Sequence, residues 1–222
     1  PEVPEEDLVR IRELVGHNAD VVVTPHEQAL DHVADSEVIL GLVTKNLFLA
    51  APKLRWVQSI SSGVDMFFYP EFLASDVLLT SEKGLVGEHL ADHGFGLLLM
   101  LTRQLAPALR HGSDSWNHRQ DMRFQEIELS GSTFGIYGLG GTGRAMAKRA
   151  AAFGMNCIAV DRDPVEPSPE VQEVWGPDRF HELLAVSDVV TICCPLTRET
   201  RNVFDKSAFD SMKDSAFLMN VT

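Results

Sequence analysis

The stretch of sequence that decides the fold is Phe134-Gly135-Ile136-Tyr137-Gly138-Leu139-Gly140-Gly141-Thr142-Gly143. Its glycines 138, 140 and 143 form the pattern G-x-G-x-x-G directly after an apolar run that is typical of a buried strand. An apolar helical face follows, with Met146, Ala150 and Phe153 at helical spacing, and a glycine can end that helix. A strand, a glycine turn and a helix in this order predict the first crossover of an α/β fold with a parallel sheet.

Each glycine of this turn has a physical task. The first allows a tight turn, the second lets a diphosphate approach the backbone without meeting a Cβ atom, and the third brings the helix close to the strand. Free amides at the start of the helix then face the anion. The pattern therefore predicts that the turn binds a dinucleotide through Gly138, Leu139, Gly140, Gly141, Thr142 and Gly143.

An acidic residue lies at the position where a fold of this kind binds the ribose. Asp161 lies 18 residues after Gly143, at the end of the next predicted strand, where a carboxylate can accept hydrogen bonds from ribose hydroxyls. The same carboxylate would repel a 2′-phosphate, so the sequence favours NAD over NADP as the cofactor. The neighbouring Arg162 weakens that preference.

Outward from this turn, apolar strands alternate with helical segments in both directions, which indicates parallel sheets. We predict a boundary at Thr80-Ser81 between two units, residues 1–80 and 81–222. A long helix over 86–111, which Pro107 kinks, follows the boundary, and 112–130 is predicted to be irregular, with Trp116 and Phe124 as apolar anchors. The predicted strands are 21–23, 38–40, 56–60, 77–79, 133–137, 156–161, 189–193 and 216–221, with further helices near 29–33, 142–153, 178–186 and 206–212.

Composition excludes several classes of protein. The 222 residues carry a formal net charge of −13, from 32 acidic and 19 basic side chains, which argues against nucleic acid or an anionic membrane surface as the main partner. The apolar stretches are far shorter than the roughly 20 residues that a membrane span needs. Three cysteines, Cys157, Cys193 and Cys194, are typical of a reducing cytoplasm rather than of a disulfide scaffold. Both ends of the sequence read as interrupted α/β units, so we expect a fragment of a longer chain.

The glycine turn and its neighbours together resemble the D-isomer-specific 2-hydroxyacid dehydrogenase family. No single motif is decisive, but several occur in the family's order and span most of the sequence. Gly87 departs from the pattern, because alanine is usual there. The matching segments are 61–65, Gly87-Glu88-His89 with Arg103, Trp116, 152–155, 187–190, 194–200, Met212-Lys213 and 220–222.

The resemblance implies a flavodoxin-like substrate unit over 1–80 and a Rossmann NAD-binding unit over 81–222, both incomplete. It implies hydride transfer between NAD(H) and C2 of a small 2-hydroxy or 2-oxo acid, in a cytoplasmic homodimer built around the long helix. Amides at Ser62 and Gly63 would hold the substrate carboxylate, and Cys194, Pro195, Thr200 and Thr222 would lie along the cofactor. The family's catalytic arginine, glutamate and histidine are expected beyond Thr222, so no catalytic residue is assigned.

Other interpretations stay open. A non-catalytic NAD-sensing regulator, or a phosphoglycerate or formate dehydrogenase, could use the same scaffold. Thr24-Pro25-His26 resembles the setting of a catalytic histidine, but we favour a surface helix start as its explanation. His89 and His93 have a spacing that could bind zinc, yet no third ligand is placed by the sequence, and we predict no metal site.

Overall fold

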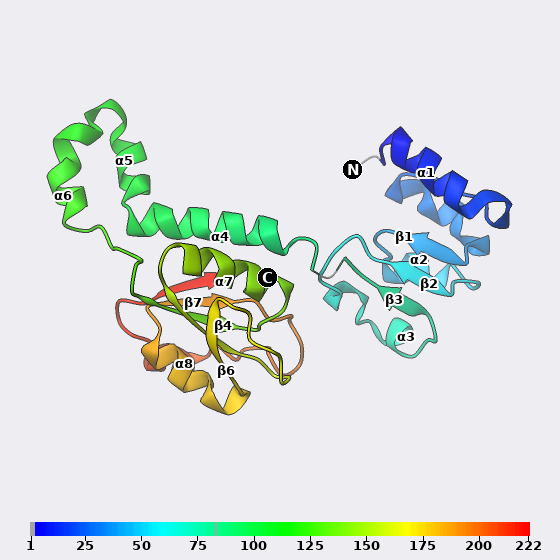
Figure 1. Cartoon of the computed structure of the whole chain (residues 1–222). Coiled ribbons are helices and arrows are strands. Elements are labelled where there is room, and N and C mark those ends of the chain that lie inside the picture. Colours follow the sequence, from blue (N-terminus) through cyan, green and yellow to red (C-terminus); the bar gives the residue numbers. More distant parts are fainter. Residues whose placement is uncertain (1–2, 83) are drawn as a thin grey trace. The chain divides into compact units, whose positions relative to one another are not determined.

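The computed structural model describes residues 3–82 and 84–222 and divides the chain into two compact units (Figure 1). The first unit runs to Ile60 and includes Met66–Thr80, and the second contains Ser61–Asp65 and everything from Ser81 onwards. The units meet in sequence at Thr80-Ser81, but the short loop Ser61–Asp65 groups with the second unit. Both units combine helices with parallel strands, so the predicted α/β fold is confirmed.

A three-stranded parallel sheet, in the order β1-β2-β3, forms the centre of the first unit. Beside it, four aromatic rings from Phe48, Phe67, Tyr69 and Phe72 pack with centroid distances of 5.1–5.8 Å. The helices and strands of this unit are α1 (Glu5–Val15), β1 (Val38–Leu40), α2 (Lys45–Leu49), β2 (Trp56–Gln58), α3 (Pro70–Leu73) and β3 (Leu78–Thr80). Short 3-10 helices cover Gly16–Asn18, His26–Asp31, Val33–Asp35 and Asp65–Phe67.

The strand predicted at 21–23 is wrong. These residues pair with no strand among the described residues, and the side chains of Val22 and Val23 are 62% and 50% exposed. A β-branched run becomes a strand only where a neighbouring strand accepts its backbone hydrogen bonds. The helix predicted near 29–33 is instead two short 3-10 helices.

The second unit is built on a five-stranded parallel sheet in the order β6-β5-β4-β7-β8. Strand β6 (Val171–Trp175), which pairs with β5 at an edge of the sheet, was not predicted from the sequence. The other strands match the predicted ones closely. The strands and helices are β4 (Thr133–Tyr137), α7 (Gly141–Ala152), β5 (Asn156–Val160), β6, α8 (Phe180–Val186), β7 (Val189–Ile192), α9 (Lys206–Ser211) and β8 (Phe217–Asn220), with a 3-10 turn at Pro177–Arg179.

Two helices cover one face of this sheet, where the main core lies. Helix α4 (Gly87–Thr102) runs along α7 (Figure 1), and fully buried Leu98, Phe134 and Met146 fill the space between the helices and the sheet. At Gly94 a Cβ atom would be only 3.1 Å from Val221 Cγ1, so a glycine allows α4 to pack this closely. On α8, Phe180 and Leu184 pack against a second cluster on the sheet.

The long helix breaks earlier than predicted. Helix α4 ends at Thr102, Gln104 adopts a left-handed conformation with φ 55°, and α5 (Leu105–His111) starts anew. Pro107 lies in the first turn of α5, where a proline costs no helical hydrogen bond.

The segment 112–130, predicted to be irregular, is helical in its first part and irregular only over 124–130. It forms a 3-10 helix over Gly112–His118 and α6 (Arg119–Arg123). Trp116 and Phe124 are not buried anchors, because their side chains are 71% and 89% exposed.

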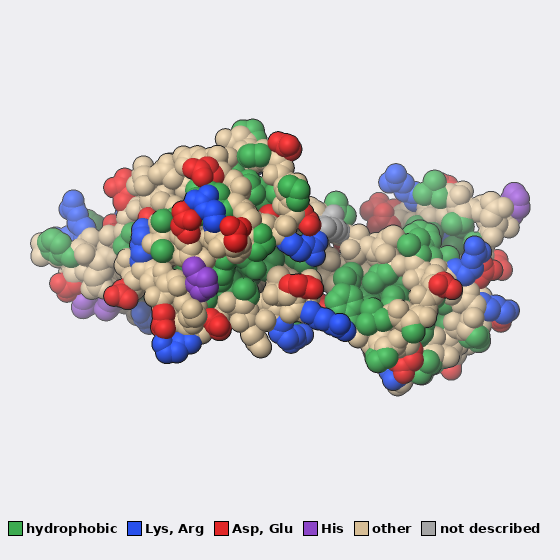
Figure 2. All heavy atoms as spheres, turned by 90° about the horizontal axis from the view of Figure 1, so that it is seen from below, with side chains coloured by type: hydrophobic (Ala, Val, Ile, Leu, Met, Phe, Trp, Pro, Cys, Tyr) green, Lys and Arg blue, Asp and Glu red, His purple; other side chains and the backbone are tan. Residues whose placement is uncertain are grey.

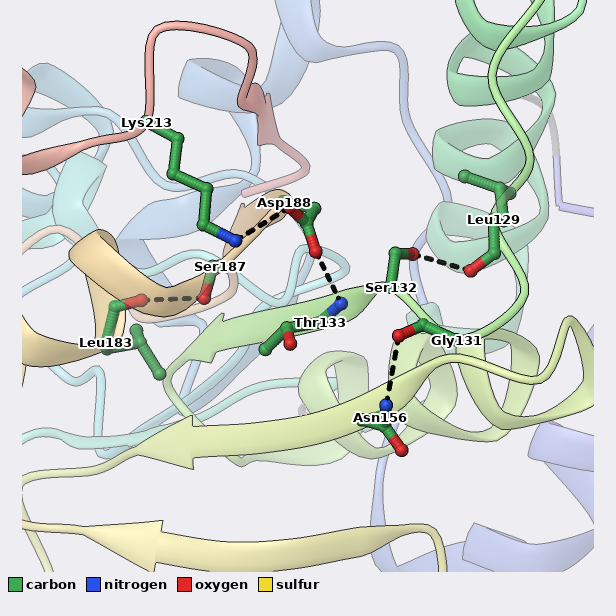
Figure 3. A network of polar contacts seen from close by, with 9 residues as sticks. All are labelled: Leu129, Gly131, Ser132, Thr133, Asn156, Leu183, Ser187, Asp188 and Lys213. Carbon is green, nitrogen blue, oxygen red and sulfur yellow. Dashed lines mark hydrogen bonds and ion pairs between the residues drawn. The ribbon is translucent and has the colours of Figure 1, made fainter.

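Polar contacts at the amino ends of the strands hold the second sheet together (Figure 3). One oxygen of Asp188 accepts from the Thr133 amide at 2.8 Å, and the other accepts from Lys213 Nζ at 2.7 Å. Burial raises the pKa of Asp188, but the hydrogen bonds from Lys213 and Thr133 outweigh it and hold the pKa below its usual value. Ser187 is fully buried, and its hydroxyl donates to the Leu183 carbonyl at 2.6 Å. The segment 187–190 therefore has a structural role.

We expect Asp188→Asn to lower the free energy of unfolding by about 1–2 kcal/mol near pH 7, because the amide cannot replace the charged acceptor of Lys213. A carboxyl group with a lowered pKa stabilises the fold above its unfolded-state pKa, and that stabilisation is lost as the pH falls through the folded-state pKa. Urea unfolding of both proteins at several pH values checks this. A difference that does not shrink on acidification would contradict it.

Candidate functional site

The carboxyl ends of the second sheet's strands form the candidate site. Strand β4 stands at the point where the strand order reverses, with β5 and β6 on one side and β7 and β8 on the other. Loops that leave neighbouring strands in opposite directions at such a point open a crevice, and ligands of open α/β sheets bind there. The glycine turn, Asp161 and the Cys193-Cys194 pair all follow strands at this edge.

The first and third glycines of the turn are required by the protein itself. Gly138 has φ 99°, and a Cβ atom there would be 2.7 Å from the Cys194 nitrogen. A Cβ atom on Gly143 would be 2.2 Å from the Gly138 carbonyl oxygen. Distances this short exclude any side chain, so these two glycines fix how closely α7 and the end of β7 approach the turn.

The middle glycine is different. Apart from Gly140 itself and its two chain neighbours, no heavy atom of the described residues lies within 4 Å of the position that a Cβ atom on Gly140 would occupy. Its φ of −80° and ψ of −160° are open to other residues. Gly140 is also the N-cap of α7, and within the described chain no side chain caps the first amides of that helix. The space in front of Gly140 therefore fits an anion that accepts hydrogen bonds from these amides.

A second close contact borders the start of α7. A Cβ atom on Gly141 would be 2.9 Å from the Gly84 Cα, and one on Gly87 would be 3.1 Å from the Thr142 nitrogen. The residues before and at the start of α4 thus pack on the first turn of α7. From the sequence, Gly87 is predicted only as a departure from alanine. The close packing of Gly84 on Gly141 was not predicted.

The side chain of Asp161 points toward the glycine turn. Its Oδ2 accepts from the Leu139 amide at 2.7 Å, and its Oδ1 accepts from the Asp163 amide at 3.0 Å. Each carboxylate oxygen has a further lone pair that can accept from a ligand hydroxyl. Arg162 does not turn toward the carboxylate of Asp161, because its guanidinium is bound by Asp163 at 3.2 and 2.9 Å.

The turn after β7 contributes the other predicted residues. The Cys193 amide donates to the Tyr137 carbonyl at 2.8 Å, which brings Cys194 against Gly138. Burial raises the pKa of Cys193 to about 12, and it raises the pKa of Cys194 as well, so both thiols are protonated at neutral pH. Thr200 Oγ1 donates to the Pro195 carbonyl at 2.7 Å and gives this loop a defined shape.

The remaining predicted residues lie farther from the turn in the topology. Thr222 follows β8, an edge strand separated from β4 by β7, and its amide and hydroxyl both bind Asn220 Oδ1 at 3.1 Å. Ser62 donates to the Glu82 carbonyl at 3.1 Å, which ties the Ser61–Asp65 loop to the second unit. The hydroxyl of Ser62 is thus engaged within the protein, and Gly63 lies beside it in the same loop.

Two other features carry no site in the described part of the chain. No group of three or more histidine, cysteine, aspartate and glutamate side chains could hold a metal ion among residues 3–82 and 84–222, and Asp92 next to His93 is instead paired with Arg149. His26 begins a 3-10 helix in the first unit, whereas the glycine turn belongs to the second unit. No helix within the same residues is long and apolar enough to span a membrane. Charged side chains of both signs are intermingled on the face shown in Figure 2.

Comparison with known proteins gives consistent matches. The model of the D-isomer specific 2-hydroxyacid dehydrogenase, NAD binding domain, matches residues 95–222. The D-3-phosphoglycerate dehydrogenase of Methanocaldococcus jannaschii is 32% identical over 97% of this chain and 41% of its own length. The glyoxylate reductase of Thermococcus litoralis is 31% identical over 91% of this chain and 64% of its own length. The chain therefore spans less than two thirds of the length of each of these two curated relatives.

Solved structures agree with these matches. A D-isomer specific 2-hydroxyacid dehydrogenase family protein from Aeromonas salmonicida has a TM-score of 0.76 at 27% identity, covering 97% of this chain and 70% of that one. The D-lactate dehydrogenase of Aquifex aeolicus, solved with NAD and lactic acid, has a TM-score of 0.75 at 25% identity, covering 98% of this chain and 66% of that one.

The contrast between the glycines gives a stability prediction. We expect Gly143→Ala to lower the free energy of unfolding by about 2–4 kcal/mol, because the new methyl group meets the Gly138 carbonyl. Gly140→Ala should stay within about 1 kcal/mol of the wild type, since its methyl group enters open space. Chemical unfolding of the two variants side by side measures this, and equal losses would show that the turn packs differently.

Proposed function

The chain belongs to the D-isomer specific 2-hydroxyacid dehydrogenase family, and from that membership we propose that it forms part of an oxidoreductase. The reaction is hydride transfer between NAD(H) and C2 of a small 2-hydroxy or 2-oxo acid. The observation that carries the proposal is the open space at Gly140, in front of the uncapped start of α7, at the strand where the sheet order reverses. A side chain would fill this space, and a diphosphate fits it.

The residues of the second unit suit the parts of NAD. The first amides of α7, at Gly141 and Thr142, donate to the diphosphate, and Asp161 accepts from the adenosine ribose. The loop at Cys194, Pro195 and Thr200 lines the cofactor, with Thr222 at the same edge of the sheet. When bound, the nicotinamide supplies or accepts the hydride.

The substrate needs a site for its carboxylate and a route for one proton. We place the carboxylate at the backbone of Ser62 and Gly63, in the loop that Glu82 ties to the second unit. The proton-transfer histidine with its glutamate, and the arginine that binds the substrate, are proposed to lie outside these 222 residues. Residues 1–80 would then act as the substrate unit and 81–222 as the NAD unit. The similarity to a glyoxylate reductase and to a D-lactate dehydrogenase favours a small 2-oxo acid as the substrate.

A homodimer in the cytoplasm completes the proposal. The α4–α6 segment exposes large apolar side chains, namely Leu97, Leu101, Leu109, Trp116 and Phe124. An exposed apolar surface of this kind supports pairing with a second copy. The three free cysteines support a reducing compartment.

One alternative substrate has a specific observation behind it. The D-3-phosphoglycerate dehydrogenase of M. jannaschii matches over 97% of this chain at 32% identity. Oxidation of a phosphorylated 2-hydroxy acid on the same site is therefore the second candidate.

The activity is tested in the longer protein that also carries the proposed catalytic residues, by NADH oxidation in the presence of glyoxylate, hydroxypyruvate, pyruvate and bulkier 2-oxo acids, with 3-phosphoglycerate and NAD assayed in the reverse direction. We expect turnover with at least one of them. Gly140→Ala should weaken NADH binding about ten-fold or more, because its methyl group occupies the diphosphate space while stability is preserved. Tight NADH binding without turnover would favour a NAD-sensing regulator, and absence of NADH binding would refute the proposal.

The cofactor preference depends on the carboxylate at the end of β5. Asp161→Ala should bring the affinities for NADH and NADPH closer together, because it removes both an acceptor for the ribose and a charge that repels the 2′-phosphate. Titration of each dinucleotide measures the ratio of the two dissociation constants. An unchanged ratio would show that Asp161 does not contact the ribose.

A further inference from the structure

We propose that Asp163 is a specificity-determining residue: its carboxylate holds Arg162 in an ion pair and so keeps the guanidinium from binding a cofactor 2′-phosphate. This inference rests on the proposed function, because it concerns how the same edge of the sheet distinguishes NAD from NADP. Neither the glycine pattern nor the position of Asp161 predicts this role for Asp163.

The contacts of Asp163 serve both of the residues before it. Its carboxylate accepts from Arg162 Nε at 3.2 Å and from Arg162 Nη2 at 2.9 Å, so one edge of the guanidinium is bound by both oxygens. Its backbone amide donates to Asp161 Oδ1 at 3.0 Å. The side chain therefore restrains Arg162, while the backbone orients the carboxylate that is proposed to bind the ribose.

An unrestrained arginine at this position would change the chemistry of the site. Arginine binds phosphate through two parallel hydrogen bonds, and an arginine near the ribose is how such folds accommodate the 2′-phosphate of NADP. The edge of Arg162 that carries Nε and Nη2 is one that a phosphate can use for two parallel hydrogen bonds, and Asp163 occupies it. The ion pair thus competes directly with a 2′-phosphate.

The surrounding charges act in the same direction. The hydrogen bond and the charge of Asp163 raise the pKa of Arg162 most, and Glu199 and Asp161 add to this. Glu199 lies on the loop after β7. Three carboxylates therefore favour the charged form of this guanidinium, and their negative charges oppose the approach of a dianionic phosphate.

The ion pair contributes little to the fold. The side chains of Arg162 and Asp163 are 72% and 60% exposed, and exposed pairs of this kind stabilise proteins only slightly. A substitution that breaks the pair therefore leaves the protein folded, so its effect on cofactor choice can be measured.

The test is a double-mutant cycle read out by binding, without substrate. The purified protein and its Asp163→Ala, Arg162→Ala and Asp163→Ala/Arg162→Ala variants are titrated with NADH and NADPH by fluorescence or calorimetry. We expect Asp163→Ala to raise the affinity for NADPH relative to NADH about five- to ten-fold, because Arg162 becomes available to the 2′-phosphate. In the double variant this gain should disappear. Alanine keeps the backbone amide that binds Asp161, so only the side chain is tested.

Matched controls separate this mechanism from simpler ones. Asp163→Glu keeps the charge and should keep the preference for NADH. Asp210→Ala removes an exposed carboxylate that is similarly ion-paired, with Lys206 on α9, and should leave the ratio unchanged. Thermal unfolding confirms that each variant is folded.

The possible results are distinct. An unchanged NADPH to NADH ratio in Asp163→Ala, with NADH binding intact, would overturn this inference alone. A gain that persists in the double variant would also overturn it, since the effect would then come from lost repulsion and not from Arg162. Failure of the wild-type protein to bind either dinucleotide would refute the proposed function, and this inference with it.

Discussion

The close approach of three chain segments at Gly138 is the constraint on which the candidate site depends. The Gly138 carbonyl leaves no room for a side chain on Gly143, and Gly138 itself lies against the Cys194 backbone. Its amide donates to the Val160 carbonyl at 2.8 Å, so the ends of β4, β5 and β7 meet within one turn. Because backbone contacts make this junction, the positions of the surrounding side chains follow from the chain path and not from side-chain packing.

The parts of the fold that were predicted correctly are those with a local physical signal. The glycine turn has one explanation for each glycine, and the apolar runs of β4, β5 and β7 are long enough to identify as strands. Strand β6 was missed because Gln172 and Glu173 interrupt its apolar pattern at the edge of the sheet, where alternation is weak. The run at 21–23 has a strand-like composition but no strand to pair with among the described residues.

The break at Gln104 illustrates a different limit. A left-handed glutamine is rare and carries no compositional signal, whereas Pro107 carries a strong one that points to the wrong residue. In the site, the residue types were predictable but their hydrogen bonds were not. That Asp161 accepts from two backbone amides, or that Asp163 binds Arg162, depends on the direction of the chain after β5, which no spacing rule gives.

The two ends of the second sheet's strands differ in what their polar residues do. At the amino ends, Lys213 and the Thr133 amide both donate to Asp188 and so tie strands together, and buried Ser187 anchors α8 to the same end. At the carboxyl ends, the first amides of α7 are left without a side-chain cap beside the open space at Gly140, and the Asp161 carboxylate binds the Leu139 amide of the glycine turn. This separation allows evolution to change ligand preference through exposed side chains at the carboxyl rim with little penalty in folding, because these side-chain ties between strands lie at the opposite rim.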